Sequence, residues 1–384
     1  MMKNMNMNHI KGCDKKDPSY ESCMRVFSTD LHVSAKPIQP RKHTLVNRIK
    51  QYQYLRDKLS LLKDDDCLET KKNTDGSQGY TIRNIINLKK RIGSKSKFGL
   101  IYLTSIPSLA NTYPIATKVM PYTMSNIYEV YIMKMITTDI LLRGVSRHFL
   151  MIYGGCACSK RIAQKLKLIS INELADGDIK MLIQIPEVVG NTELMFNLFI
   201  QTFISIATFH NLVGYVHRDT HYGNFLYQTN SEKGYYHYIF NGKDYYLKSC
   251  KYNIIIYDYG FARRIDTYTK DDVSEGKISI YKDYSKIINA FIKKHRGGWN
   301  TIAILDTKLS DTMVLFKNAL YNDIKHEVDY SQSHSQSQSP TPSPYASSLF
   351  AYILEEMFLK YAPKGMLITE RPSNVINATP FRIN

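Results

Sequence analysis

The chain has 384 residues, of which 43% are hydrophobic, and a formal net charge of +17 at pH 7. This length allows roughly two or three domains or one two-lobed enzyme, and the apolar content suffices for a sizeable core. The positive charge favours polyanionic partners: nucleotides, nucleic acid, acidic proteins or anionic membrane. No apolar run reaches the roughly 18 residues of a membrane span, and the N-terminus lacks the apolar segment of a signal peptide. We therefore expect a soluble, intracellular protein.

The six cysteines show no regular spacing along the chain. Cys156 and Cys158 fall on one face of an expected strand, but no second pair of cysteines completes a zinc site. We therefore expect free thiols and a reducing compartment.

The first 90 residues are expected to hold two segments. Residues 1–45 mix Met, Asn, Lys, Ser and Pro without periodicity, which predicts a disordered basic arm. Residues 46–90 are expected to form an N-terminal helical extension. Its main helix, over about residues 43–63, is indicated by apolar residues at helical spacing. These residues are Leu45, Ile49, Tyr52, Leu55 and Leu59.

Residues 91–102 change to a pattern of strand, polar turn and strand. Gly93 and Gly99 flank the turn, and Phe98 precedes the second glycine. Taken alone, this pattern predicts a hairpin.

A second apolar strand follows at residues 115–120 and contains Ala116 and Lys118. A lysine within an apolar strand is costly unless its ammonium group meets an anion. Residues 148–158 and 180–187 are expected to be the next strands of the same small sheet.

A long helix over residues 193–212, with a mixed core-facing pattern, is expected to end near Gly214. It leads into the stretch Val216–Asn224. Between this stretch and the next strand, Asn241-Gly242 predicts a tight hairpin. We also expect helices beginning near Asp283 and over residues 347–361, and a disordered Ser/Gln/Pro loop at 331–346.

Polar residues in two places along the chain suit the chemistry of phosphoryl transfer. The apolar strand Asn253–Tyr257 delivers Asp258, which lies 39 positions after Asp219. Transfer of a phosphoryl group from ATP needs a carboxylate near the attacking hydroxyl and oxygen ligands that hold Mg²⁺ against the phosphates. Asp219 can be the carboxylate, and Asn224 with Asp258 can be the metal ligands.

His217-Arg218-Asp219, with Asn224 five residues after the aspartate, resembles the catalytic loop of protein kinases. Four further features carry a closer resemblance: the short gap between Lys118 and Glu129, Asp258-Tyr259-Gly260, the helix that begins at Asp283-Tyr284, and the terminal Pro380-Phe381-Arg382-Ile383. In these features the chain is similar, over about residues 91–384, to the divergent protein-kinase-like proteins of the nucleocytoplasmic large DNA viruses. The resemblance implies an α+β, bilobal kinase-like fold. Its β-rich N-lobe would span residues 91–187 and its larger helical C-lobe residues 188–384, with a hinge near 183–189.

The resemblance also implies roles for residues in the N-lobe. Lys118, paired with Glu129, would hold the α- and β-phosphates of ATP, although a surface-exposed Glu129 is an alternative. The segment from Gly93 through Phe98 to Gly99 would cover the phosphates, and Ala116 would line the nucleotide site. The implied activity is ATP- and Mg²⁺-dependent phosphorylation of serine or threonine in a protein, in the host cytoplasm or the virion.

His221 leaves alternatives open, because serine/threonine kinases usually have a lysine at this position. A protonated histidine could take part of that role, or it could pack under the loop against a backbone carbonyl. The pattern around His221 is closer to small-molecule kinases of the aminoglycoside and choline type, which are the first alternative. A pseudokinase scaffold is the second. Nucleic-acid binding rests on net charge alone, without an aromatic-basic motif.

Overall fold

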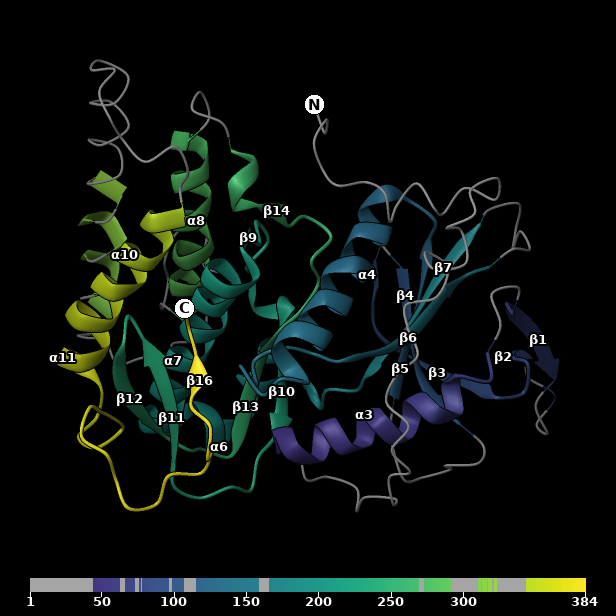
Figure 1. Cartoon of the computed structure of the whole chain (residues 1–384), viewed down its shortest axis with the longest axis horizontal. Helices are drawn as coiled ribbons and strands as arrows, with labels where there is room; N and C mark the ends of the chain where they lie inside the picture. The colour runs from purple at the N-terminus through teal and green to yellow at the C-terminus, as the bar shows by residue number, and fades with distance from the viewer. Residues whose placement is uncertain are drawn as a thin grey trace. The chain divides into compact units, whose positions relative to one another are not determined.

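The computed structural model describes residues 44–62, 66–72, 76, 78–96, 99–106, 115–158, 166–268, 273–291, 310–322 except 312, 316 and 320, and 343–384. Nearly all of the expected basic arm and most of the expected Ser/Gln/Pro loop lie outside these residues, while the last four residues of that loop, 343–346, are helical. The chain divides into two compact units (Figure 1). The first holds Met1–Arg143 and Leu150–Leu174, and the second holds Gly144–Phe149 and Ala175–Asn384.

The first unit is built on a seven-stranded antiparallel sheet, with the strand order β1-β2-β3-β4-β5-β7-β6 (Figure 1). Its strands are β1 (Leu68–Lys72), β2 (Gln78–Ile82), β3 (Ile86–Ser96), β4 (Gly99–Ser105), β5 (Ile115–Pro121), β6 (Ile152–Ala157) and β7 (Lys167–Glu173). The hairpin expected from residues 91–102 is the β3–β4 pair. Apolar, β-branched strands such as β5 and β7 are buried along most of their length, which makes them the centre of this unit's core.

Two helices of the first unit contact the β6 end of the sheet. Helix α3 (Leu45–Leu59) matches the amphipathic helix expected from the sequence, and the Thr44 hydroxyl caps it by accepting the Asn47 N–H. Helix α4 (Met124–Ile136) is capped by Thr123. The hydroxyl of Thr123 accepts the Asn126 N–H, which satisfies one donor of the first turn.

A buried ion pair fastens α3 to the end of β7. Arg48 Nε and Nη2 each lie 2.8 Å from a carboxylate oxygen of Glu173. Glu173 Oε2 also accepts the Met151 N–H at 3.2 Å. Because both charged groups are almost fully buried, this bidentate pair fixes the orientation of α3 against the sheet.

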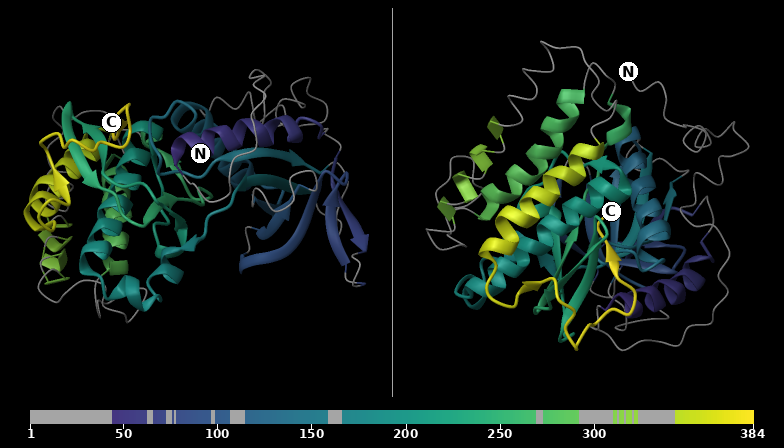
Figure 2. Two further views of the ribbon diagram at one scale, coloured as in Figure 1. Left: turned by 90° about the horizontal axis from the view of Figure 1, so that it is seen from below. Right: turned by 60° about the vertical axis from the view of Figure 1, so that its left-hand side comes forward.

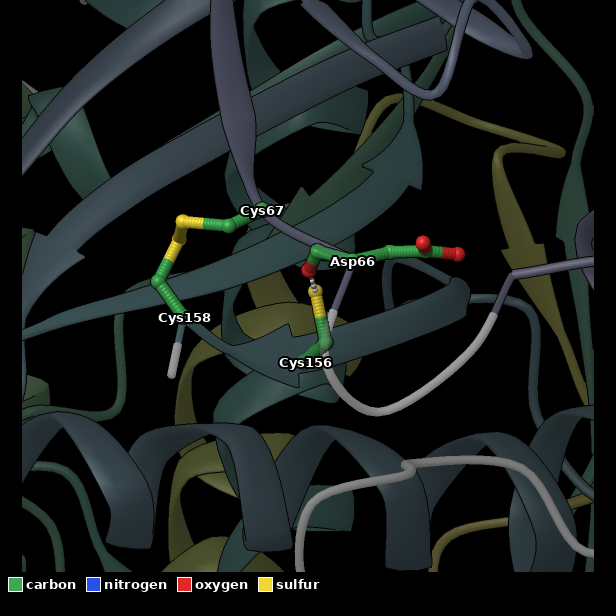
Figure 3. The surroundings of a disulfide bond; sticks show 4 residues. All are labelled: Asp66, Cys67, Cys156 and Cys158. Atoms are coloured by element: carbon green, nitrogen blue, oxygen red, sulfur yellow. Dashed lines mark hydrogen bonds between the residues drawn. A yellow bond between two sulfur atoms is a disulfide. The ribbon is translucent and has the colours of Figure 1, made fainter. Parts of the chain in front are cut away.

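A disulfide joins Cys67 to Cys158 and links positions 91 residues apart in the first unit (Figure 3). Their Cα atoms are 4.8 Å apart, a separation at which a disulfide forms readily. The Sγ atom of Cys156 lies 3.6 Å from the Asp66 carbonyl, beside the disulfide. The expectation of free thiols is therefore wrong for Cys67 and Cys158, because the fold brings together cysteines that sequence spacing kept apart.

The second unit contains the longest helices (Figure 2). Helix α7 (Thr192–Thr208) continues through the π-helical turn η3 (Phe209–Val213) and ends at Gly214, whose φ of 78° is left-handed. The stretch Thr192–Val213 is long and apolar enough to cross a membrane, but 83% of its apolar 18-residue window is buried in the fold. The helices that pack with it are α8 (Val273–Phe291) and α10 (Ser343–Ile353), the latter continued by η6 (Leu354–Phe358) and α11 (Leu359–Tyr361).

Three small sheets complete the second unit. One has the order β13-β10-β8, from β13 (Tyr252–Ile256), β10 (Phe225–Thr229) and β8 (Gly177–Asp178), and β14 (Arg263–Arg264) pairs with β9 (Tyr215–Val216). The third contains β15 (Leu367–Ile368), β12 (Lys243–Lys248), β11 (Tyr235–Phe240) and β16 (Phe381–Arg382) (Figure 2). The predicted hairpin is the β11–β12 pair, in which Asn241 and Gly242 take positive φ values.

The strand expected at residues 180–187 is absent, and this stretch forms the short helices α5 (Ile179–Leu182) and α6 (Pro186–Val189). The Asp178 carboxylate caps α5 by accepting the Met181 N–H at 2.8 Å, and Pro186 occupies the first turn of α6. Both residues favour helix starts. The predicted α+β class is confirmed, while the lobe limits at residue 187 stay a prediction.

Candidate active site

The loop that carries Asp219 is held between the end of a buried helix and a short strand pair. Gly214 ends the α7–η3 helix, and β9 then pairs with β14, so that Val216 lies opposite Arg263. The next residues, from His217 to Asn224, form the loop. Its first part is therefore fixed by regular hydrogen bonding before the polar residues begin.

Asp283, on α8, holds this loop through hydrogen bonds to its backbone. Its Oδ2 accepts the His217 N–H at 2.7 Å, and its Oδ1 accepts the Arg218 N–H at 2.8 Å. Oδ2 also lies 2.9 Å from His210 Nε2, and the Asp283 side chain is fully buried. Arg218 has a φ of 69°, a left-handed conformation that most residues avoid, and these bonds hold it in place.

His217 supports the loop from within the core. Its Nε2 donates to the Tyr257 carbonyl at 3.0 Å, and its Nδ1 accepts the Asp219 N–H at 3.3 Å. The ring packs against Phe209 and Tyr259. Burial lowers the pKa of His217, although the nearby carboxylates act in the opposite direction. The neutral ring is thus the form that positions Asp219.

Asp219 is half-buried and faces basic groups. Its Oδ2 lies 3.5 Å from His221 Nε2, and its Oδ1 lies 4.0 Å from Lys286 Nζ. The hydrogen bond from His221 is the main influence that lowers the pKa of Asp219, and the charges of His221 and Lys286 add to it against the effect of burial. Asp219 is therefore ionised at neutral pH, as a group that receives a proton must be.

Asn224 lies directly beside Asp219 and is almost fully buried. Its Nδ2 donates to the Asp219 carbonyl at 2.8 Å and to Asp219 Oδ2 at 3.2 Å. With Nδ2 bound in this way, Oδ1 is the atom of Asn224 that can ligate a cation. This orientation of the amide follows from its hydrogen bonds.

Strand pairing brings Asp258 close to Asn224. β10 begins one residue after Asn224, β13 ends at Ile256, and the two strands pair antiparallel with Phe225 opposite Ile256. The Tyr257 N–H donates to the Asn224 carbonyl at 2.9 Å. Asp258 therefore follows a residue bonded to Asn224, and its φ of 67° turns the chain sharply at this position.

His221 reaches solvent, with 29% of its side chain exposed. Its Nδ1 accepts the Gly223 N–H at 3.1 Å, which places the proton of the neutral ring on Nε2, facing Asp219. This contact is with a backbone N–H group, and the alternative in which His221 packs under the loop against a backbone carbonyl stays a prediction.

In the first unit, Lys118 and Glu129 form a buried ion pair. Lys118 Nζ lies 2.7 Å from Glu129 Oε1 and 2.9 Å from Oε2, and 4% and 1% of the two side chains are exposed. The expected pairing is thus present, and the alternative of a solvent-exposed Glu129 is wrong. Lys118 lies in the middle of β5, between Ile101 on β4 and Ser170 on β7.

Three of the four other nucleotide-site residues expected in the first unit lie on the neighbouring strands β3, β4 and β5. Ala116 is buried on β5, two residues before Lys118. Gly99 begins β4 with a φ of 154°, and a Cβ there would come within 2.9 Å of both Met120 Cγ and the Val119 carbonyl. This close approach of β4 to β5 admits only glycine. Gly93 lies within β3, and Phe98 lies outside the described residues.

The sequence patterns predict no role in the site for His210 or Lys286. For Asp283 they predict only a helix, whose Asp283-Tyr284 start is one point of the family resemblance. The contacts of these three residues span at least 65 positions of the chain. An aspartate on the buried face of a helix is the one local signal that could have indicated a role for Asp283, since a buried carboxylate requires hydrogen-bond or charged partners.

The donor set near Asp219 fits a magnesium ion bound together with a nucleotide. Among the described residues, no group of three or more His, Cys, Asp or Glu could hold a metal ion by itself. Mg²⁺ needs fewer protein ligands, because waters and substrate phosphates complete its coordination shell. The amide oxygen of Asn224 and the carboxylate of Asp258 are ligands of the required kind.

No family model and no curated protein matches the chain. Among solved structures, the chain is similar to the crystal structure of a Plasmodium kinase domain, with 15% sequence identity and a TM-score of 0.35. The similarity covers 55% of this chain and 71% of that chain. The strands and helices of the described residues form an α+β fold.

Proposed function

We propose that the chain is an ATP- and Mg²⁺-dependent phosphotransferase, and that it acts as a serine/threonine protein kinase. One observation carries the proposal: Asp219, Asn224 and Asp258, from separate parts of the sequence, are joined by hydrogen bonds and strand pairing in one loop cluster. A buried lysine–glutamate pair in the first unit adds the cation that would hold nucleotide phosphates.

In the proposed reaction, Asp219 orients the acceptor hydroxyl and receives its proton. Its lowered pKa keeps it ionised at neutral pH, and Asn224 and His217 fix its position from two sides. This arrangement suits a reaction in which the protein contributes mainly positioning and electrostatic stabilisation. Lys118 would hold the α- and β-phosphates, and the Gly93–Gly99 hairpin would cover them.

Asn224 and Asp258 would hold the magnesium ion, which would neutralise charge that develops on the phosphates. The Asn224 side chain can do so without moving, because the hydrogen bonds of Nδ2 already fix the amide plane. Asp258 would act from the left-handed turn that follows β13.

The resemblance to viral protein-kinase-like proteins supports a protein acceptor and activity within an infected cell. His221 favours a second candidate, a small-molecule kinase, because its position usually holds lysine in protein kinases. The contacts of His221 with Asp219 and Gly223 suit either acceptor.

Purified protein supplied with γ-labelled ATP and Mg²⁺ would test the proposal, first with mixed protein acceptors and then with a panel of metabolites. Label on serine or threonine of a protein is the expected result, and label on a metabolite instead would favour the second candidate. A scaffold without activity would transfer no label to either. A thermal shift with Mg-ATP, expected to approach ~2.7 kcal/mol at about 100 times Kd, would then show whether nucleotide still binds.

A further inference from the structure

Lys286 is placed to hold the loop together with Asp283. The two residues lie three apart on α8 and therefore share a helix face. Asp283 Oδ1 accepts the N–H of Arg218 at 2.8 Å, and Lys286 Nζ donates to the carbonyl of the same residue at 2.9 Å. One turn of α8 thus binds both backbone polar groups of the residue that precedes Asp219.

The same ammonium group stands beside the carboxylate of Asp219. Lys286 Nζ lies 4.0 Å from Asp219 Oδ1, while His221 Nε2 lies 3.5 Å from Oδ2. About a third of each of the Lys286 and Asp219 side chains is exposed, at 36% and 32%. Both groups are therefore accessible to a substrate, unlike His217, which reaches Asp219 from the buried side.

Lys286 and His221 differ in the donors that they have left for a substrate. His221 Nδ1 accepts the Gly223 N–H, so that only Nε2 is left, and it faces Asp219. Lys286 bears an ammonium group with three N–H donors, so the bond to the Arg218 carbonyl leaves two for other oxygens. An acceptor hydroxyl held by Asp219 would bring the incoming phosphoryl group close to this cation.

We infer that Lys286 is a catalytic residue, whose ammonium group contacts the phosphoryl group as it passes to the hydroxyl held by Asp219. The inference rests on the proposed function. The bond between the γ-phosphorus and the bridging oxygen of ATP breaks, and a bond from phosphorus to the hydroxyl oxygen forms. ADP leaves, and the hydroxyl proton goes to Asp219. Lys286 exchanges no proton and stabilises the charge on the phosphoryl oxygens.

The test compares four variants in steady-state phosphotransfer from ATP. Lys286→Met should lower kcat roughly 30- to 100-fold. This is less than the roughly 100- to 1,000-fold decrease in kcat that follows removal of a buried oxyanion donor, because Lys286 is partly exposed. The KM for ATP and the melting temperature should change little. Lys286→Arg, which keeps the charge, should retain most of the activity. His221→Lys, added to Lys286→Met, should restore at least about tenfold, because it returns a permanent cation to the other side of Asp219. Lys282→Met, an exposed lysine on the same helix, is the matched control and should behave as wild type.

A kcat for Lys286→Met within about threefold of wild type would overturn the inference. So would a large loss that neither Lys286→Arg nor His221→Lys repairs, since that pattern would assign Lys286 to holding Arg218 alone. Asp219→Asn separates this failure from that of the proposed function. If wild type transfers phosphate and Asp219→Asn does not, the proposed function stands whatever Lys286 does. If wild type transfers none, both fall.

Discussion

Lys118 Nζ lies 2.7 Å from Glu129 Oε1, and both side chains are buried in the first unit. An apolar strand tolerates the ammonium because α4 carries the carboxylate that neutralises it. The pair is 11 positions apart in the sequence, so only the fold of β5 against α4 decides that the two groups meet.

Removing one member of this pair should destabilise the protein as well as inactivate it. Lys118→Met leaves the Glu129 carboxylate buried without its cation, which typically costs about 3–5 kcal/mol. The double variant Lys118→Met/Glu129→Leu should regain much of that stability, since both charges are gone, yet remain inactive. Urea unfolding and phosphotransfer assays on both variants measure the two effects separately. A Lys118→Met variant as stable as wild type would show that Glu129 does not depend on this partner.

Asp283→Asn should weaken activity through the position of the catalytic loop. The amide keeps one carbonyl oxygen but turns an N–H₂ group toward one of the two backbone N–H groups, those of His217 and Arg218, that now donate to the carboxylate. We expect kcat to fall roughly 100-fold with a small change in the KM for ATP, because Asp219 is displaced. Stability should fall by about 2–3 kcal/mol, since a buried charged acceptor is lost. Unaltered kcat would mean that Asp283 does not position the loop.

His217 should make stability depend on pH. Burial lowers its pKa in the folded protein, so below about pH 6.5 the unfolded chain binds a proton that the folded chain does not. The contribution of His217 is therefore complete above that pH and is lost as the pH falls through the folded-state pKa. In His217→Phe, the difference in unfolding free energy between about pH 7.5 and about pH 5.5 should be smaller than in wild type. An equal or larger difference would contradict this account.

Reduction of the Cys67–Cys158 bond should destabilise the protein. The bond joins positions 91 residues apart, and closing a loop of that length restricts the unfolded chain by about 4–5 kcal/mol in the chain-entropy estimate. A reducing agent should therefore lower the urea midpoint of wild type toward that of Cys67→Ser. The same agent should leave Cys67→Ser unchanged, which serves as the control. If the reducing agent did not change the urea midpoint of wild type, the bond would not form in solution.

The elements that the sequence predicted well are those specified within a few residues. Helix α3 follows from its apolar spacing, and the β11–β12 hairpin follows from Asn241-Gly242, which accept positive φ. The prediction of a strand at residues 180–187 is wrong because a short apolar run can be a strand or a buried helix turn. The capping role of Asp178 decides the question there, and it becomes visible only in the structure.

In the candidate site, too, the residues that lie close together in the sequence were predictable, and those brought together only by the fold were not. His217, Asp219 and Asn224 lie in one short stretch, so their motif is readable, and Asp258 follows from the strand before it. Asp283 and Lys286 contact the loop from more than 60 positions away, and nothing near them in the sequence indicates that contact. Cys67 and Cys158 were missed for the same reason.

The central claim is that Asp219, Asn224 and Asp258 act together in phosphoryl transfer, and the rate of transfer from γ-labelled ATP tests it most directly. Asp219→Asn and Asp258→Asn are the variants to compare with wild type, since asparagine tolerates the left-handed φ of 67° at position 258. We predict that wild type transfers label, that each variant is slower by roughly 1,000-fold or more, and that both keep the wild-type melting temperature within a few degrees. Transfer at the wild-type rate by either variant would contradict the account.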